Sequence, residues 1–413
     1  MTFSQKCFNF GDKEKKLKEK NYCASKKKII KKIKNCSFGF IDDLYNKNLD
    51  IIFDSVRKLQ NFENILLLGT GGSSLGGKTL VSLFDNIFYN STKPKLYFIE
   101  NIDEKSILQL LKNIDLSTTG IIVTSKSGET IETISQYFFV ENFYRKKKIS
   151  LKKRVFIITE NKKSVLKEIQ ENHDYYYLEH PSFVGGRYSV FSIVGLLPAA
   201  LVDFDIKAFC IGAKSFLKKI QNEKTFDSFF FSSLSIFNLN KKRINMSVIM
   251  PYSDSLNNLS FWYRQLWSES IGKKRKGITP INALGTVDQH SQLQLYLDGP
   301  KDKIFTIIGR KLNSNSLSLN CSISRKKKYP VMHSKSLEQL LFAEMKATIK
   351  SLKNQKLPVR TIMIERISEE VIGSLMMFFF IETILCCSLL NLNPFNQPAV
   401  EEGKKLAKIY LNK

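Results

Sequence analysis

A glutamate near the end of a predicted helix is the candidate proton carrier of this chain. Glu269 lies in the segment QLWSESIGK at residues 265–273, directly after the apolar pair Leu266 and Trp267. A carboxylate that is partly removed from water suits general-base catalysis. The segment taken alone fits the alternative better, a solvated carboxylate at a helix end.

Arg187 and His290 could act beside such a base. Arg187 follows two glycines in VGGRYSV at residues 184–190, and its permanent charge could stabilise an oxyanion. A surface arginine in a turn explains this segment equally well. His290 lies between Gln289 and Ser291, which favours a polar site over a core position. Lys404 carries no signal of its own in a chain so rich in lysine.

A glycine-rich loop, GTGGSSLGG at residues 69–77, directly follows the apolar run at 65–68. Its glycines let the backbone approach an anion, and the following helix offers its first N–H groups. The string GSSLGGKT at residues 72–79 fits the P-loop pattern of NTPases. A dinucleotide loop fits less well, because Ser74 replaces its third glycine. A sugar-phosphate site ranks level with the P-loop here, and a tight turn without ligand is the remaining interpretation.

A second loop, SKSGETIET at residues 125–133, favours the sugar phosphate. It follows the apolar run at 120–124 and carries several hydroxyls and one ammonium group. Such a turn can bind a terminal phosphate without a metal, although hydroxyls also cluster at helix starts as N-caps. Two loops at the ends of neighbouring parallel strands predict a shared ligand crevice.

The elements that must position these loops follow an alternating α/β rhythm. Short apolar runs with little polar alternation are typical of strands buried on both faces, and hence of a parallel sheet covered by helices. Strands are expected at residues 65–68, 96–100, 120–124, 155–159, 175–178, 246–250, 304–308 and 359–364. Helices are expected at residues 51–59, 203–239, 256–268, 336–352, 372–390 and after Pro398.

Composition limits the classes of protein that fit. The net charge is +26, from 64 basic and 38 acidic residues, which invites a nucleic-acid partner, but a solvated lysine-rich surface is the preferred interpretation. Seven cysteines without a CxxC pair indicate reduced thiols rather than disulfides or zinc, and hence a cytoplasmic protein. No signal peptide is expected. The apolar run at 375–390 contains Glu382 and is predicted to be a buried helix rather than a membrane span.

Six segments together resemble the phosphoglucose isomerase family, in the order and with the spacing typical of it. The resemblance extends from about residue 60 to the C-terminus. The segments are GGSSLG at 71–76, SKSGET at 125–130, VGGRYS at 184–189, QLWSES at 265–270, DQHS at 288–291, and FNQ at 395–397 through Lys404. Two departures are Glu129, where the family often has threonine, and Ala399, which replaces a frequent glycine.

The resemblance implies two doubly wound αβα sandwich domains of sugar-isomerase type with mainly parallel sheets. It also implies roles for twelve residues. Ser125, Lys126, Ser127 and Thr130 would hold the phosphate, whereas Gly72, Ser73, Gln265 and Gln397 would contact the sugar. Arg187 would steady an enediolate, Glu269 would move a proton between C1 and C2, and His290 with Lys404 would open the ring. His290 would come from a neighbouring subunit, which implies a homodimer.

The expected activity is the interconversion of D-glucose 6-phosphate and D-fructose 6-phosphate through a cis-enediol, in glycolysis and gluconeogenesis. No metal or redox cofactor is expected. A glucose/mannose 6-phosphate isomerase and a non-catalytic sugar-phosphate sensor that uses its basic surface on nucleic acid are the alternatives. The expected organisation is a basic helical segment at 1–55, sugar-isomerase domains at 56–205 and 206–395, and a C-terminal helix at 396–413.

Overall fold

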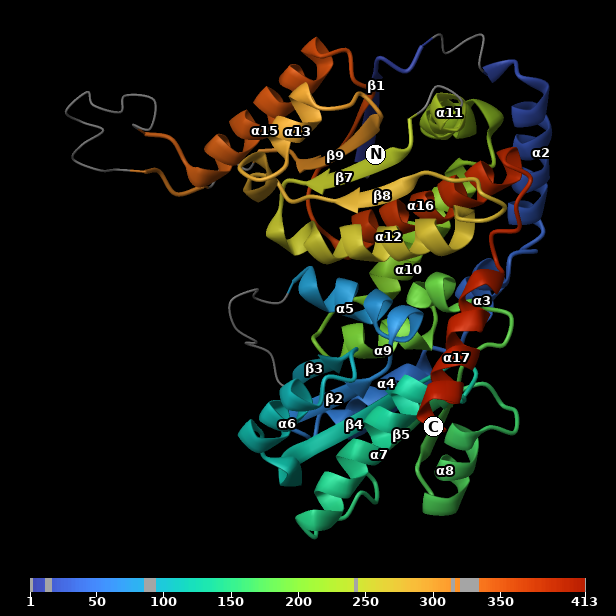
Figure 1. Cartoon of the computed structure of the whole chain (residues 1–413), viewed down its shortest axis with the longest axis vertical. Helices are drawn as coiled ribbons and strands as arrows, with labels where there is room; N and C mark the ends of the chain where they lie inside the picture. The colour runs from blue at the N-terminus through green and yellow to red at the C-terminus, as the bar shows by residue number, and fades with distance from the viewer. Residues whose placement is uncertain are drawn as a thin grey trace.

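The computed structural model describes residues 3–11, 17–84, 94–240, 244–312, 316–319 and 334–412. It contains two five-stranded sheets, one built mainly from each half of the chain. The sheets lie at opposite ends of the molecule with a layer of helices between them, among them α5, α9, α10 and α12 (Figure 1). The expected fold class, two αβα units with mainly parallel sheets, is confirmed.

The first sheet is entirely parallel, in the order β3-β2-β4-β5-β6. Its three inner strands are buried along their whole length, as expected for runs without polar alternation. The strands are β2 (Asn64–Leu68), β3 (Lys95–Ile99), β4 (Thr119–Thr124), β5 (Val155–Thr159) and β6 (Tyr176–Glu179).

The second sheet has the order β1-β10-β9-β7-β8, and only β1 runs antiparallel to its neighbour. Strand β1 corrects the expectation of a basic helical segment at 1–55, because residues 3–8 pair in register with β10. Strand β8, which contains Pro280, was also not expected. The strands are β1 (Phe3–Phe8), β7 (Met246–Pro251), β8 (Thr279–Asn282), β9 (Lys303–Arg310) and β10 (Val359–Ile364).

The helices cover both sheets and fill the space between them. In the first half they are α2 (Lys20–Lys34), α3 (Gly39–Asn46), α4 (Asp50–Leu59), α5 (Leu75–Ser82), α6 (Glu104–Asn113), α7 (Ile131–Lys146), α8 (Val165–His173) and α9 (Ile193–Ala200). In the second half they are α10 (Ile206–Lys219), α11 (Glu223–Asn240), α12 (Asn257–Ile271), α13 (Leu293–Asp298), α15 (Leu337–Asn354), α16 (Glu369–Leu389) and α17 (Glu401–Leu411). Short 3₁₀ turns η1 (Gly71–Ser73), η3 (Gly186–Phe191) and η7 (Pro398–Val400) border the candidate site, and η5 (Val287–Gln289) directly precedes His290.

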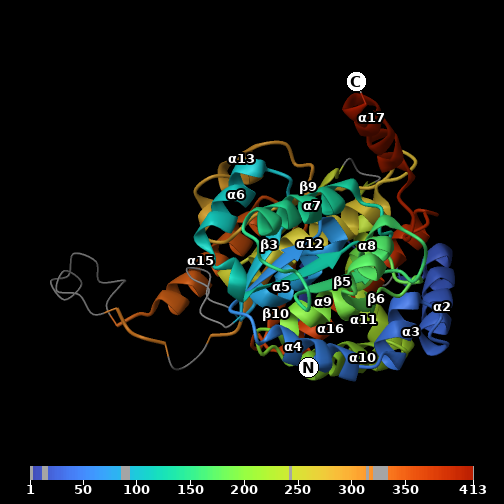
Figure 2. The ribbon, with the colours of Figure 1, turned by 90° about the horizontal axis from the view of Figure 1, so that it is seen from below.

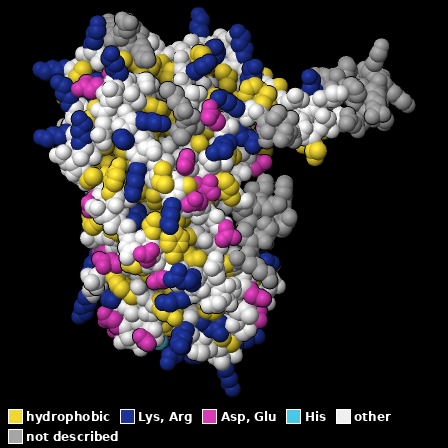
Figure 3. All heavy atoms as spheres, turned by 180° about the vertical axis from the view of Figure 1, so that it is seen from behind, with side chains coloured by type: hydrophobic (Ala, Val, Ile, Leu, Met, Phe, Trp, Pro, Cys, Tyr) yellow, Lys and Arg dark blue, Asp and Glu magenta, His cyan; other side chains and the backbone are white. Residues whose placement is uncertain are grey.

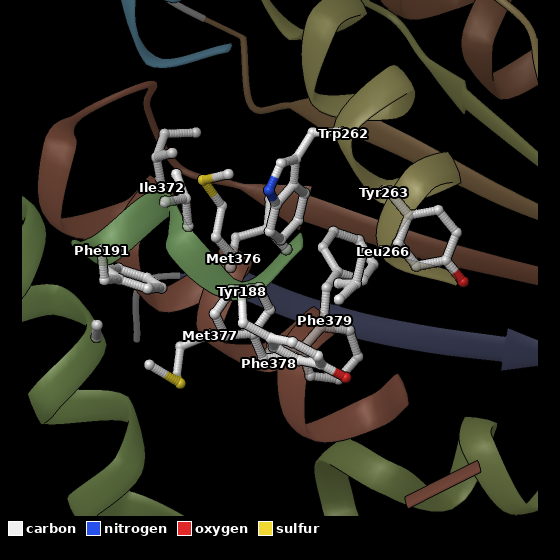
Figure 4. Packing of buried hydrophobic residues seen from close by; sticks show 14 of the residues in the cluster. Tyr188, Phe191, Trp262, Tyr263, Leu266, Ile372, Met376, Met377, Phe378 and Phe379 are labelled. Carbon is white, nitrogen blue, oxygen red and sulfur yellow. The ribbon is translucent and has the colours of Figure 1, made fainter. Parts of the chain in front are cut away.

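Helix α16 is the centre of the core. By length and composition it could cross a membrane, but 94% of its apolar window is buried inside the fold, as predicted for a core helix. It packs against α12 and against η3, whose Tyr188 and Phe191 point into the same cluster (Figure 4). The aromatic rings of Tyr188 and Phe380 lie 4.8 Å apart. This packing fixes η3, and therefore Arg187, against the end of α12.

On the face shown in Figure 3, basic side chains are spread over the surface and acidic side chains lie among them. Helix α17 projects away from the body of the molecule (Figure 2), and every described residue in it is exposed. Its apolar residues Leu406, Ile409 and Leu411 therefore face water in a single copy.

Candidate active site

The glycine-rich loop connects β2 to α5 through the short turn η1. Gly71 has a φ of +59°, and a Cβ there would lie 3.1 Å from the side-chain nitrogen of Gln265. A Cβ on Gly72 would lie 2.4 Å from the carbonyl carbon of Gly186. Only glycine permits this backbone-to-backbone approach, which places the loop directly beside the turn that carries Arg187.

The P-loop interpretation of this segment is wrong. A P-loop needs the hydroxyl after its lysine to bind Mg²⁺. Thr79 is fully buried instead, and its hydroxyl donates to the carbonyls of Leu75 at 2.7 Å and Asn258 at 3.1 Å. Lys78 forms an ion pair with Glu100. Both residues of the apparent motif are therefore used to fix α5.

The hydroxyl-rich loop between β4 and α7 forms its own hydrogen-bonded turn. The hydroxyls of Ser125 and Thr130 lie 2.9 Å apart, and the Glu129 N–H donates to the Ser127 hydroxyl at 3.1 Å. Thr130 occupies the N-cap position of α7, yet its hydroxyl makes no capping bond. The Thr130 hydroxyl therefore does not cap the helix, and N-capping alone does not explain the hydroxyl cluster. The hydroxyls gather at a helix N-terminus, where an anion is favoured.

Lys126 points from this loop toward the segment after β6. Its ammonium group donates to the Ser182 carbonyl at 2.7 Å and lies 3.5 Å from the Glu160 carboxylate. His180, directly after β6, is 1% exposed, and its Nδ1 lies 3.0 Å from the Pro181 carbonyl. Burial lowers the pKa of His180 to about 4, so this ring is neutral behind the loop at neutral pH.

The Glu269 carboxylate lies between an arginine and an amide. Oε2 accepts from Nη1 of Arg187 at 3.1 Å, and Oε1 accepts from the Gln265 side chain at 2.8 Å. The side chain of Glu269 is 30% exposed, whereas that of Arg187 is only 4% exposed. The carboxylate is therefore paired and partly buried rather than fully solvated. It retains an open side toward a ligand.

Arg187 is held by five acceptors from two distant parts of the chain. Its Nε donates to the Ser270 hydroxyl at 2.9 Å, and Nη1 also donates to the Gln397 side-chain oxygen at 2.9 Å. Its Nη2 donates to the carbonyls of Pro394 at 2.6 Å and Asn396 at 3.0 Å. A buried guanidinium with all donors engaged has a fixed orientation.

A hollow of about 730 Å³ opens beside Glu269, between the end of α12 and the segment that leads into α17. Its lining residues are Ser268, Glu269, Gly272, Lys273, Lys274, Arg275, Lys276, Leu392, Asn393, Asn396, Gln397, Pro398, Ala399 and Val400. Within the described residues, no group of three or more His, Cys, Asp or Glu side chains could hold a metal ion.

The family pattern described as "Phosphoglucose isomerase" matches residues 55–413 of the chain. The chain belongs to the phosphoglucose isomerase family. The match confirms the resemblance read from the six sequence segments.

A relative agrees with this assignment, and solved structures share the fold. A relative from Methanococcus maripaludis, named "Probable glucose-6-phosphate isomerase", is 37% identical over 97% of this chain and 90% of its own length. A structure of a hypothetical protein, TT0462, from Thermus thermophilus is 26% identical, with a TM-score of 0.87 over 99% of this chain and 100% of that chain. A glucose-6-phosphate isomerase structure from Chlamydia trachomatis has a TM-score of 0.74 at 23% identity, over 90% of this chain and 74% of that chain, and shares the fold.

The structure of this phosphoglucose isomerase family member brings most of the predicted site residues together. Gly72 touches the Arg187 turn, and Arg187, Gln265, Glu269 and Gln397 form one hydrogen-bonded group. The phosphate-loop candidates Ser125, Lys126, Ser127 and Thr130 follow a strand whose end adjoins the glycine loop, since a Cβ on Gly69 would lie 3.1 Å from the carbonyl oxygen of Thr124. A short path of contacts thus connects the two loops with Glu269.

His290 and Lys404 are the two predicted residues that stay apart within one copy. The His290 side chain is exposed after η5, and Lys404 pairs with Glu401 at 2.8 Å on the surface of α17. Among the described residues, neither the His290 nor the Lys404 side chain makes a hydrogen bond or an ion pair with Glu269. Asp288 fixes the turn before His290, because its carboxylate accepts from the Leu284 N–H and the Ser291 hydroxyl, both at 2.6 Å.

Two contributors to the site were not predicted. The Ser270 hydroxyl accepts a hydrogen bond from Arg187. In the sequence, only its position next to Glu269 pointed to Ser270. Lys273 donates to the carbonyls of Ser270 at 2.8 Å and Asn393 at 2.6 Å. A lysine that binds backbone carbonyls has no sequence signature among so many lysines.

Proposed function

We propose that this chain interconverts D-glucose 6-phosphate and D-fructose 6-phosphate, an aldose–ketose isomerisation of glycolysis and gluconeogenesis. The observation that carries the proposal is the Glu269–Arg187 pair at 3.1 Å, held beside the glycine loop that adjoins a hydroxyl-rich turn. The reaction needs one base, one stabiliser of negative charge and one grip on the phosphate. The base and the charge stabiliser are hydrogen-bonded to each other, and the glycine loop lies between the Arg187 turn and the strand that leads into the hydroxyl-rich turn. The family assignment supports the same reaction.

In the proposed mechanism, Glu269 removes the proton from C2 of the open-chain aldose. The electron pair of that C–H bond forms the C1–C2 double bond, and the carbonyl electrons move to O1. Arg187 stabilises this cis-enediolate, because its charge is fixed and already oriented before the reaction. Glu269 then returns the proton to C1 as the O2 proton moves to O1, which leaves the ketose. The hydroxyls of the 125–130 turn hold the phosphate throughout.

The decisive test is Glu269→Gln in a coupled assay on glucose 6-phosphate. Glutamine keeps the bond to Arg187 but cannot accept the C2 proton, so kcat should fall by about 10³-fold or more while KM changes by less than about fivefold. Glu104→Gln, an exposed glutamate in the first turn of α6, is the control and should retain full activity. Retained turnover in Glu269→Gln would remove Glu269 from its role. If the unmodified protein binds the sugar phosphate without converting it, the non-catalytic sensor is favoured. Equal rates on mannose 6-phosphate would favour the glucose/mannose 6-phosphate isomerase.

We also propose that the active form is a homodimer in which His290 enters the neighbouring subunit's hollow. The exposed His290, the open hollow beside Glu269 and the uncovered apolar residues of α17 support this arrangement. Residue Lys404 would then complete the ring-opening pair as α17 packs against the assembled dimer. Within the described part of a single copy, by contrast, neither His290 nor Lys404 makes a hydrogen bond or ion pair with Glu269.

Mixed dimers test this proposal directly. Co-expressed Glu269→Gln and His290→Ala chains should each be inactive alone, yet mixed dimers contain one intact site. With random pairing, half of the dimers are mixed and half of their sites are intact, so about a quarter of the normal activity should return. No recovery would place both residues in the same chain's site.

We further propose a cytoplasmic location, which the free cysteines Cys7, Cys23, Cys36, Cys210, Cys386 and Cys387 support.

A further inference from the structure

The segment that carries Gln397 is a turn, residues 393–397, with two cations bound to its backbone carbonyls. Arg187 binds the carbonyls of Pro394 and Asn396 and also the Gln397 side chain. Lys273 binds the carbonyl of Asn393 at 2.6 Å. These two cations connect the turn with the catalytic group, as does the ring of Phe395, which lies 5.2 Å from that of Tyr188.

Lys273 connects this turn with the helix that carries Glu269. It follows Glu269 by four residues, and its ammonium group also donates to the Ser270 carbonyl at the C-terminal end of α12. Cations are favoured at the C-terminal end of a helix, where carbonyls lack intrahelical partners. One ammonium group thus binds the end of the Glu269 helix and the start of the Gln397 turn together.

We propose that Lys273 is a positioning residue of the isomerase site, which fixes the 393–397 turn against α12 and so holds the Gln397 side chain on Arg187. The inference rests on the proposed isomerase function. Lys273 acts through Gln397 and Arg187 rather than on the sugar itself, because its ammonium group is already bound to two carbonyls. Burial, and then the nearby charge of Arg187, lower the pKa of Lys273, consistent with its half-buried place in the group.

Two basic residues that do not line the hollow provide matched controls. Lys303, at the start of β9, donates to the Pro300 carbonyl at 3.2 Å. Lys112 is exposed in the last turn of α6. Lys303→Met removes a comparable carbonyl contact, and Lys112→Met removes a comparable charge, without releasing Asn393.

A double-mutant cycle with Gln397→Ala tests the proposal. Lys273→Met should lower kcat/KM by about 10- to 100-fold, the usual size for a lost hydrogen bond to a charged group, with most of the loss in kcat. In the Gln397→Ala background the same substitution should cost less than about threefold, because the side chain that Lys273 positions is gone. Lys273→Arg should recover part of the activity, and both controls should stay within about threefold of the unmodified enzyme.

Equal losses from Lys273→Met in both backgrounds would overturn the proposal, since Lys273 would then act independently of Gln397. An unchanged kcat/KM in Lys273→Met would also overturn it. If Lys273→Met does not fold, Lys273→Gln, which keeps a donor on a shorter side chain, enters the same cycle. The unmodified protein separates the two hypotheses: without isomerase activity the proposed function itself fails, whereas an active enzyme with independent losses rejects only the role of Lys273.

Discussion

The buried neutral histidine behind the hydroxyl-rich loop should make the protein lose stability in mild acid. His180 is 1% exposed, and burial lowers its pKa from 6.5 to about 4. Between these two values the unfolded chain binds a proton that the folded chain does not. Stability therefore falls as pH decreases from about 6.5 toward 4, and this residue causes no further loss below that range.

The size of the effect follows from the two pKa values. The contribution of His180 to the loss is about 2 kcal/mol at pH 5 and about 3 kcal/mol at pH 4, relative to neutral pH. A loss of this size is a large part of the marginal stability of a folded protein. His180→Asn should remove it, because an asparagine side chain can still donate to the Pro181 carbonyl but does not titrate.

Urea unfolding of the unmodified protein and of His180→Asn, between pH 4.5 and 8, measures the difference. Between pH 7 and pH 5 the free energy of unfolding of the unmodified protein should fall by about 2 kcal/mol more than that of His180→Asn. Thr159→Ala, which removes a buried hydroxyl beside His180 but no titratable group, is the control and should keep the pH dependence of the unmodified protein. Parallel curves for the unmodified protein and His180→Asn would refute the reasoning.

Three further substitutions test other parts of the molecule. Ser125→Ala should raise KM for the sugar phosphate by about tenfold, with little change in kcat in steady-state assays, because the hydroxyl cluster loses a member. Arg187→Lys should lower kcat/KM by at least about 100-fold, because an ammonium group cannot reach five acceptors; a loss confined to KM would contradict this. Glu382→Gln should reduce the free energy of unfolding by about 3 kcal/mol in urea, because it leaves the fully buried Arg360 charge unpaired; a neutral result would show that this pair is dispensable.

The strands of both sheets were predictable where the local pattern is complete. The runs at 65–68, 120–124 and 155–159 are apolar without alternation and become the fully buried β2, β4 and β5. Strand β1 lacks this signal, since Gln5 and Lys6 interrupt its apolar residues. Its extended state depends on pairing with β10, more than 350 residues later in the chain, which no local pattern encodes.

Glu129, which stands where the family often has threonine, is a second case in which the local sequence does not determine the contacts of a residue. The sequence alone left open whether a glutamate in the phosphate loop would repel an anion. In the structure its carboxylate accepts from the Val165 N–H at 2.9 Å, at the start of α8. An acidic group is favoured at a helix N-terminus, so Glu129 is turned away from the hydroxyls of Ser125 and Thr130. The loop keeps its hydroxyl cluster despite the departure.

The environment of Arg187 could not be predicted for a physical reason. Locally a surface arginine and a site arginine were equally good interpretations. The acceptors that decide between them lie 82 to 210 residues away, and two of them are backbone carbonyls, which every residue type supplies. The residue type therefore shows that a charged group is present. Arg187 becomes buried and fixed only because the turn at residues 393–397 packs against η3 and α12. The fixed orientation of the Arg187 charge depends on the contact among these three segments. Loss of that contact should weaken stabilisation of the transition state more than binding of the sugar.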